Sequence, residues 1–141
     1  PDESLLSALE TAALRGVEVN LIVPQVADQL VVGAAAQAYY EELLNWGVNL
    51  YLYQPALVHA KTMAIDDAVA FVGTSNFDIR SFSLNFEINM AFYSAAFAGE
   101  LRKRHEGYIE NSARLALDAW DARPASHRIV QNLAKLFSPL L

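Results

Sequence analysis

The sequence lacks several features that would assign a protein to a class at once. It contains no cysteine, which excludes a disulfide framework and any metal site built from thiolates. Its longest unbroken apolar run, Leu30 to Ala36, is far shorter than the roughly 20 residues that span a bilayer. Basic residues are outnumbered, because 10 lysines and arginines stand against 16 acidic residues and give a net charge of -6. That balance argues against a nucleic-acid partner, which calls for a basic surface.

Length and the first residue set the expected organisation. A chain of 141 residues is long enough to bury a core and short enough to be one unit, so we expect a single domain over residues 1–141. Position 1 is proline rather than methionine, from which we expect a piece of a longer chain.

Apolar periodicity and turn residues predict an alternation of helices and strands. Helical spacing predicts helices over residues 2–15, 28–46 and 95–112, and a last amphipathic helix after Pro124. Runs of β-favouring residues predict strands over residues 17–23, 48–53, 58–65, 68–72 and 86–93. The third and fourth strands are expected to form a hairpin turned at Asp66 and Asp67. Strands that alternate with helices are typical of an α/β layered domain.

One short stretch carries most of the chemistry. His59 and Lys61 are two residues apart, and the turn Gly73-Thr74-Ser75-Asn76 follows the next predicted strand. If the chain is extended from His59 to Lys61, both side chains project from the same face of a strand. An imidazole can attack a phosphate, while the lysine ammonium and the Asn76 amide bind its non-bridging oxygens.

A histidine at the start of a strand is, taken alone, more often a core residue whose ring bonds to a backbone carbonyl. The neighbours of His59 favour a catalytic role. Lys61 is expected on the same face of an apolar run, where an unpaired ammonium would be unfavourable. Glu87 lies in a second apolar run, residues 86–90, and needs a partner there. If the imidazole Nδ1 donates to Glu87, the tautomer is set and Nε2 is free to attack.

Two further polar residues keep more than one interpretation. Asp66, next to Asp67 at a strand end, is more typical of a turn or an ion pair than of a catalyst. Arg80 could contact a substrate head group or pair with Asp78, and the sequence favours neither.

These residues resemble the HKD signature of the phospholipase D superfamily, in the form His59-x-Lys61-x4-Asp66-x6-Gly73-Thr74-x-Asn76. The only departure is Thr74, where serine is commoner, and threonine keeps the hydroxyl. The flanking segments 39–44, 80–89 and 136–141 are similar to bacterial cardiolipin synthases, and segment 80–89 resembles the one that follows their second HKD motif.

The resemblance implies an α-β-α sandwich of the phospholipase D type and phosphodiester chemistry that needs neither metal nor cofactor. His59 is then the nucleophile or the general acid, Lys61 and Asn76 bind phosphate, and Thr74 supports the phosphate pocket. Glu87 orients the histidine, and Asp66 completes the catalytic motif in a structural role. The implied partners are an anionic phospholipid, phosphatidylglycerol, and a membrane surface, with no nucleic acid. The implied location is the bacterial cell membrane, peripheral or anchored through segments outside this chain.

One HKD motif is half of what the chemistry requires. A single imidazole cannot be bonded to phosphorus and protonate the leaving oxygen in the same step. The other histidines, His105 and His127, have no lysine two residues on. We therefore expect the C-terminal catalytic half of a two-motif enzyme, completed by a second HKD half from the same chain or from a second copy.

The expected reaction is phosphatidyl transfer through a phosphohistidine, which makes cardiolipin from two phosphatidylglycerols and releases glycerol. A phospholipase D hydrolase, another phosphatidyltransferase or a metal-independent nuclease could use the same scaffold. A degenerate, non-enzymatic domain would be expected to lose His59 or Lys61, and both are present.

Two surface features have both a membrane interpretation and a structural one. The basic residues 102–104 could contact anionic head groups, but with Glu100 and Glu106 interspersed they are more typical of a solvated helix face. The final amphipathic helix could lie on a membrane, but with only Arg128 and Lys135 for charge its packing against protein is favoured.

Overall fold

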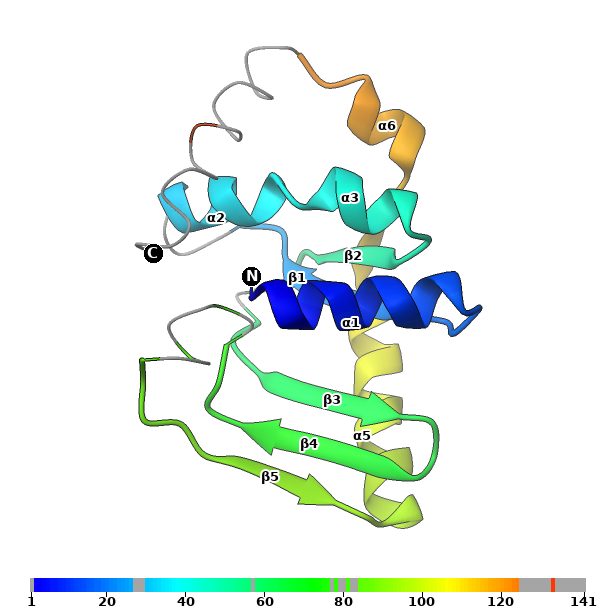
Figure 1. Cartoon of the computed structure of the whole chain (residues 1–141). Helices are drawn as coiled ribbons and strands as arrows, with labels where there is room; N and C mark the ends of the chain where they lie inside the picture. Colours follow the sequence, from blue (N-terminus) through cyan, green and yellow to red (C-terminus); the bar gives the residue numbers. More distant parts are fainter. Residues whose placement is uncertain are drawn as a thin grey trace.

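The computed structural model describes residues 2–26, 30–56, 58–76, 78, 81, 84–124 and 133. Within these residues the chain has an α/β fold with two three-stranded sheets (Figure 1). The helices are α1 (Glu3–Leu14), α2 (Leu30–Gln37), α3 (Tyr40–Asn45), α5 (Ala95–Glu110) and α6 (Leu117–Asp121). The strands are β1 (Asn20–Pro24), β2 (Asn49–Tyr53), β3 (Lys61–Ile65), β4 (Val69–Gly73), β5 (Asn89–Phe92) and β6 (Ser112–Leu115).

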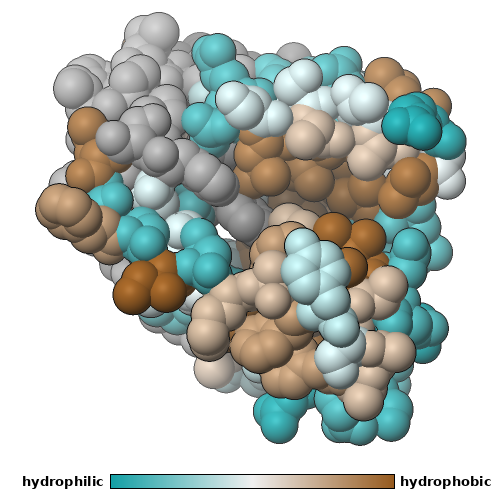
Figure 2. Space-filling view, turned by 60° about the horizontal axis from the view of Figure 1, so that its bottom comes forward, coloured by the Kyte–Doolittle hydropathy of each residue, from teal (hydrophilic) through white to brown (hydrophobic). Residues whose placement is uncertain are grey.

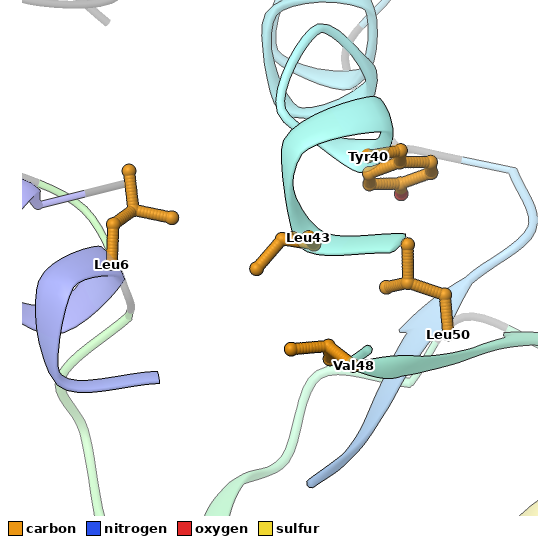
Figure 3. Close-up of a cluster of buried hydrophobic side chains, with 5 residues drawn as sticks. All are labelled: Leu6, Tyr40, Leu43, Val48 and Leu50. Carbon is orange, nitrogen blue, oxygen red and sulfur yellow. The ribbon is translucent and has the colours of Figure 1, made fainter. Parts of the chain in front are cut away.

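The first sheet has the strand order β1-β2-β6, with β1 parallel to β2 and β6 antiparallel to it. Its apolar cluster draws large side chains from α1, α3 and the start of β2: Leu6, Tyr40, Leu43, Val48 and Leu50 (Figure 3). Leu50 is fully buried, and the Trp120 ring of α6 packs at 5.4 Å from the Tyr40 ring. Burial of this many large side chains is the main force that holds the sheet to its helices.

The second sheet has the order β3-β4-β5 and is antiparallel throughout. Helix α5 covers one face of it (Figure 1), and the buried residues between them are Ala70 of β4 with Ala98 and Leu101 of α5. Alanine on both sides lets the helix approach the sheet closely. Asp66 turns the hairpin between β3 and β4 with a φ of 50°, in the left-handed region that aspartate tolerates better than most residues.

The predicted continuous helix over residues 28–46 was wrong. Helix α2 ends at Gln37 and α3 begins at Tyr40, while the predicted cap Asp28 lies outside the described residues. Between the helices the Tyr39 amide donates to the Ala36 carbonyl at 3.1 Å, three residues back, which tightens the last turn. Tyr40, the first residue after the break, lies in the core and is 7% exposed.

The predicted helix over residues 95–112 was wrong at its end, because α5 stops at Glu110 and residues 112–115 form β6. The Asn111 side chain donates to the Gly107 carbonyl at 2.8 Å and satisfies one of the last helical acceptors. Strand β6, like α6 after it, was not predicted. Its pairing partner β2 lies far earlier in the chain, so no local pattern marks it.

Three strands begin later than predicted: β1 at Asn20, β3 at Lys61 and β5 at Asn89. A strand extends only as far as its partner does, whereas β-favouring residues continue beyond that point. Of the predicted last helix only Leu133 lies within the described residues. No described helix has both the length and the apolar composition to cross a membrane.

Candidate active site

The candidate site residues lie along one edge of the second sheet. Lys61 opens β3, Gly73 closes β4 and Asn89 opens β5, and the register pairs Lys61 with Gly73 and Gly73 with Asn89. These three residues form a row across the sheet at the edge where β4 ends and β3 and β5 begin (Figure 1). Residues paired across neighbouring strands point to the same face. The Thr74–Asn76 turn leaves β4 directly from this row.

His59 lies just outside β3, not within it as predicted. β4 ends at Gly73, the partner of Lys61, and among the described residues no strand pairs with residues 58–60. The Lys61 Nζ instead donates to the His59 backbone carbonyl at 2.9 Å. His59 is solvent-exposed, and the Lys61 side chain is bonded to the His59 backbone rather than sharing a strand face with its imidazole.

Glu87 is bonded to the turn after β4. Its carboxylate accepts hydrogen bonds from the Thr74 hydroxyl and, at 3.3 Å, from the Asn85 side-chain amide. The Thr74 bond, the largest influence, lowers the pKa of Glu87 and keeps it a carboxylate. Among the described residues no hydrogen bond joins Glu87 to His59, so the predicted orientation of the imidazole by Glu87 stays a prediction.

The turn itself is tied down by several bonds. The Thr74 amide donates to the Ile88 carbonyl and the Ile88 amide donates to the Thr74 hydroxyl, both at 3.0 Å. The Asn76 amide donates to the Ser81 hydroxyl at 3.1 Å. Thr74 and Asn76, the predicted phosphate-binding residues, therefore have a backbone held from two sides. The Asn76 side chain is left exposed at the surface.

Sequence reasoning missed the residues that support this turn. Ser75 is 7% exposed and Ser81 5% exposed, and both carry a hydrogen-bonded hydroxyl. The Ser81 amide donates to the Asp78 carboxylate at 2.7 Å. That spacing of aspartate three residues before a donor is typical of a local turn, and it was a signal available in the sequence. The contact between Asn89 and Ser75 had no such signal, because 14 residues separate them.

Asp66 directly follows Ile65, the end of β3 that lies roughly 13 Å from Lys61 at the usual rise of a strand. Its carboxylate is exposed in the hairpin turn, which favours the structural interpretation over a role at the phosphate. The neighbouring Asp67 pairs with Arg102 at 2.8 Å. Arg80, the predicted head-group contact, lies outside the described residues.

The basic residues of α5 are partly engaged in surface ion pairs. Arg102 also approaches Glu106 at 3.5 Å, and Lys103 approaches Glu100 at 3.4 Å, all with exposed side chains. His105 is placed differently, since its Nε2 lies 2.9 Å from the Thr62 hydroxyl between α5 and β3. Burial there lowers the pKa of His105. In the described part of the chain, no group of three or more histidine and acidic side chains could hold a metal ion.

Residues 1–109 match the protein family described as cardiolipin synthase, PLD-like domain. The chain belongs to this family. Cardiolipin synthase A of Yersinia pseudotuberculosis serotype O:1b (strain IP 31758) and of Yersinia pestis bv. Antiqua (strain Angola) are each 42% identical to it over 141 residues. The alignments cover 100% of this chain and 29% of each relative, so the chain spans less than a third of their length.

The fold is similar to the crystal structure of a phospholipase D family member, Nuc from Salmonella typhimurium. The TM-score is 0.69 at 20% sequence identity, and the match covers 81% of this chain and 74% of that one. The predicted family and the predicted α/β fold of the phospholipase D type are therefore confirmed.

Proposed function

We propose that this chain supplies one catalytic half of a phosphatidyltransferase that makes cardiolipin from two phosphatidylglycerols and releases glycerol. The observation that carries the proposal is the complete HKD motif in a member of the cardiolipin synthase family. Within the motif, Lys61 is bonded to the His59 backbone, and hydrogen bonds hold the Thr74–Asn76 turn in place. The 42% identity to part of Cardiolipin synthase A, over the whole of this chain, supports the same substrate class.

In the first step the His59 Nε2 attacks the phosphorus of one phosphatidylglycerol. A nitrogen–phosphorus bond forms, and the bond from phosphorus to the oxygen of the head-group glycerol breaks. A general acid protonates the departing glycerol. In the second step the free hydroxyl of another phosphatidylglycerol gives up its proton to the same group and attacks phosphorus, which releases His59. Lys61 and Asn76 stabilise the charge on the non-bridging oxygens in both steps.

The general acid must come from a second HKD half. In the described part of the chain, His105 is the other histidine, and it is bonded to Thr62, whose side chain projects from the opposite face of β3 to that of Lys61. The partner half is supplied by a further segment of a longer chain or by a second copy of this one. Because the substrate is an anionic phospholipid, the assembled site works at a bacterial membrane surface.

The acceptor alcohol separates this proposal from its alternatives. If water replaces the second phosphatidylglycerol, the same intermediate hydrolyses and the enzyme is a phospholipase D. A nuclease on this scaffold would need a basic groove that tracks the phosphate backbone, which a net charge of -6 does not favour.

The test is turnover of phosphatidylglycerol in mixed micelles with EDTA, by this chain alone and by the chain joined to any remainder of its natural protein. We expect cardiolipin and glycerol in equal amounts, and a loss on the order of 10⁴-fold or more for His59→Ala. His105→Gln is the matched control and should keep most of the turnover.

Each alternative has its own outcome. Phosphatidic acid in place of cardiolipin would assign the hydrolase, and cleavage of DNA under the same conditions would assign the nuclease. Activity of the isolated chain that rises with the square of its concentration would show that two copies build the site. Turnover that survives His59→Ala would contradict the proposal.

A further inference from the structure

Asn89 crosses over Gly73 at the site edge of the second sheet. The two residues are paired in the register of β4 and β5. A Cβ placed on Gly73 would lie 1.8 Å from the Asn89 Oδ1 and 2.7 Å from the Ile88 carbonyl oxygen. Since neither distance is sterically possible, any larger residue at position 73 would displace the Asn89 side chain and the backbone that precedes β5. Glycine is needed here for clearance, not for an unusual φ.

The side chain that uses this clearance ends on Ser75. The Asn89 Nδ2 donates to the Ser75 Oγ at 2.6 Å, and Ser75 is 7% exposed. Ser75 stands between Thr74, which is predicted to support the phosphate pocket, and Asn76, to which the proposed function assigns phosphate. A bond to the middle residue of a three-residue turn sets the direction of both neighbours.

The same short segment also holds Thr74. Glu87 accepts from the Thr74 hydroxyl, and the Ile88 backbone exchanges one bond with the Thr74 amide and another with its hydroxyl. Residues 87–89 thus hold the turn through four hydrogen bonds, and Asn89 supplies the only one of them that reaches past Thr74.

We propose that Asn89 is a positioning residue of the phosphate site. It orients the Thr74–Asn76 turn through Ser75, and Gly73 leaves the space through which it does so. The inference rests on the proposed function, because it assumes that Asn76 binds phosphate and that the turn forms part of the phosphate pocket. The alternative is a structural role, in which Asn89 donates to the buried Ser75 hydroxyl and only stabilises the fold.

The test is binding of inorganic phosphate to this chain, followed by the NMR shifts of the amides of residues 74–76. We expect Asn89→Ala to weaken phosphate binding about tenfold, the effect of one hydrogen bond's free energy on affinity. Asn111→Ala is the matched control, since it also removes one side-chain amide bond, at 2.8 Å, but at the end of α5. It should leave the affinity within about twofold while lowering thermal stability similarly.

A second pair of variants guards against misfolding of the first. Ser75→Ala removes the acceptor of the same bond and should weaken phosphate binding as Asn89→Ala does. Gly73→Ala should weaken it further, and adding Asn89→Ala to Gly73→Ala should cost less than the two separate losses combined, because part of the clash is relieved.

The outcomes separate this inference from the proposed function. If Lys61→Ala abolishes phosphate binding while Asn89→Ala and Ser75→Ala do not change it, the positioning role is overturned and the proposed function stands. If Asn89→Ala and Asn111→Ala weaken binding equally, the role is only structural. If the unchanged chain does not bind phosphate at all, both the phosphate site and the positioning role fail.

Discussion

The two sheets of this protein are held together by different means. The first packs large side chains such as Tyr40, Leu43 and Leu50 against each other, each at most 7% exposed. The second buries mainly alanine against α5 and leaves large apolar residues of β5 and its flanks exposed, among them Phe86, Ile88 and Met90. Figure 2, in which the end of the molecule that bears β5 is turned forward, shows apolar side chains gathered on this side.

The difference shows how the site is stabilised. The sheet that carries Lys61 and the Thr74–Asn76 turn has little apolar burial of its own, and its site edge is bonded by polar groups from residues 87–89. Polar bonds are directional and hold side chains in place, whereas apolar packing mainly contributes free energy. We infer that the first sheet contributes most of the free energy of folding, while the hydrogen bonds of the second sheet set the positions of the site residues.

The largest expected effect is in the first sheet. Leu50→Ala should lower the free energy of unfolding by about 2–5 kcal/mol, because it empties a fully buried position. The matched control Leu84→Ala, at a residue 72% exposed beside the second sheet, should change it by less than about 0.5 kcal/mol. Urea unfolding of both variants checks this. An equal decrease in the free energy of unfolding for the two variants would contradict the proposed difference between the two sheets.

The close approach of α5 to the second sheet gives the next largest effect. Ala98 is fully buried against that sheet, so Ala98→Leu should cost about 1–3 kcal/mol by overpacking. Ala96→Leu, on an exposed position of the same helix, is the control and should be nearly neutral. If calorimetry finds Ala98→Leu neutral as well, the space between α5 and the sheet is larger than the structure shows.

The smallest effect is a pH dependence at the contact between His105 and Thr62. Burial lowers the pKa of His105 below 6.5, so the unfolded chain binds a proton where the folded protein does not. The free energy of unfolding should therefore fall as pH drops below about 6.5, with a slope under about 1.4 kcal/mol per pH unit. Solvent screening reduces the slope further, because the side chain is only half-buried.

Unfolding measured between pH 7 and 5 checks this prediction. His105→Gln should flatten the dependence. A slope that is unchanged in His105→Gln would show that other groups bind the proton.

Local patterns predicted the elements that depend only on neighbouring residues. Helix α1 was predicted over residues 2–15 and is found at Glu3–Leu14, where the Asp2 carboxylate accepts from the Ser4 amide at 2.9 Å and caps the first turn. The hairpin at Asp66 was predicted from turn chemistry and is present. The single helix over residues 28–46 failed because residues 38 and 39 form a turn between α2 and α3; Tyr40, just after it, packs on Trp120, a tertiary contact that no local pattern marks.

By itself, the sequence determined the family and the candidate site residues, because the spacing of His59, Lys61, Thr74 and Asn76 is a property of the chain alone. Only the tertiary structure decided which strand lies beside which, and hence that β3 begins at Lys61, that Glu87 bonds Thr74 and that Asn89 crosses Gly73. Residue types set what a group can bond to, but the partner it meets depends on contacts between strands distant in the chain.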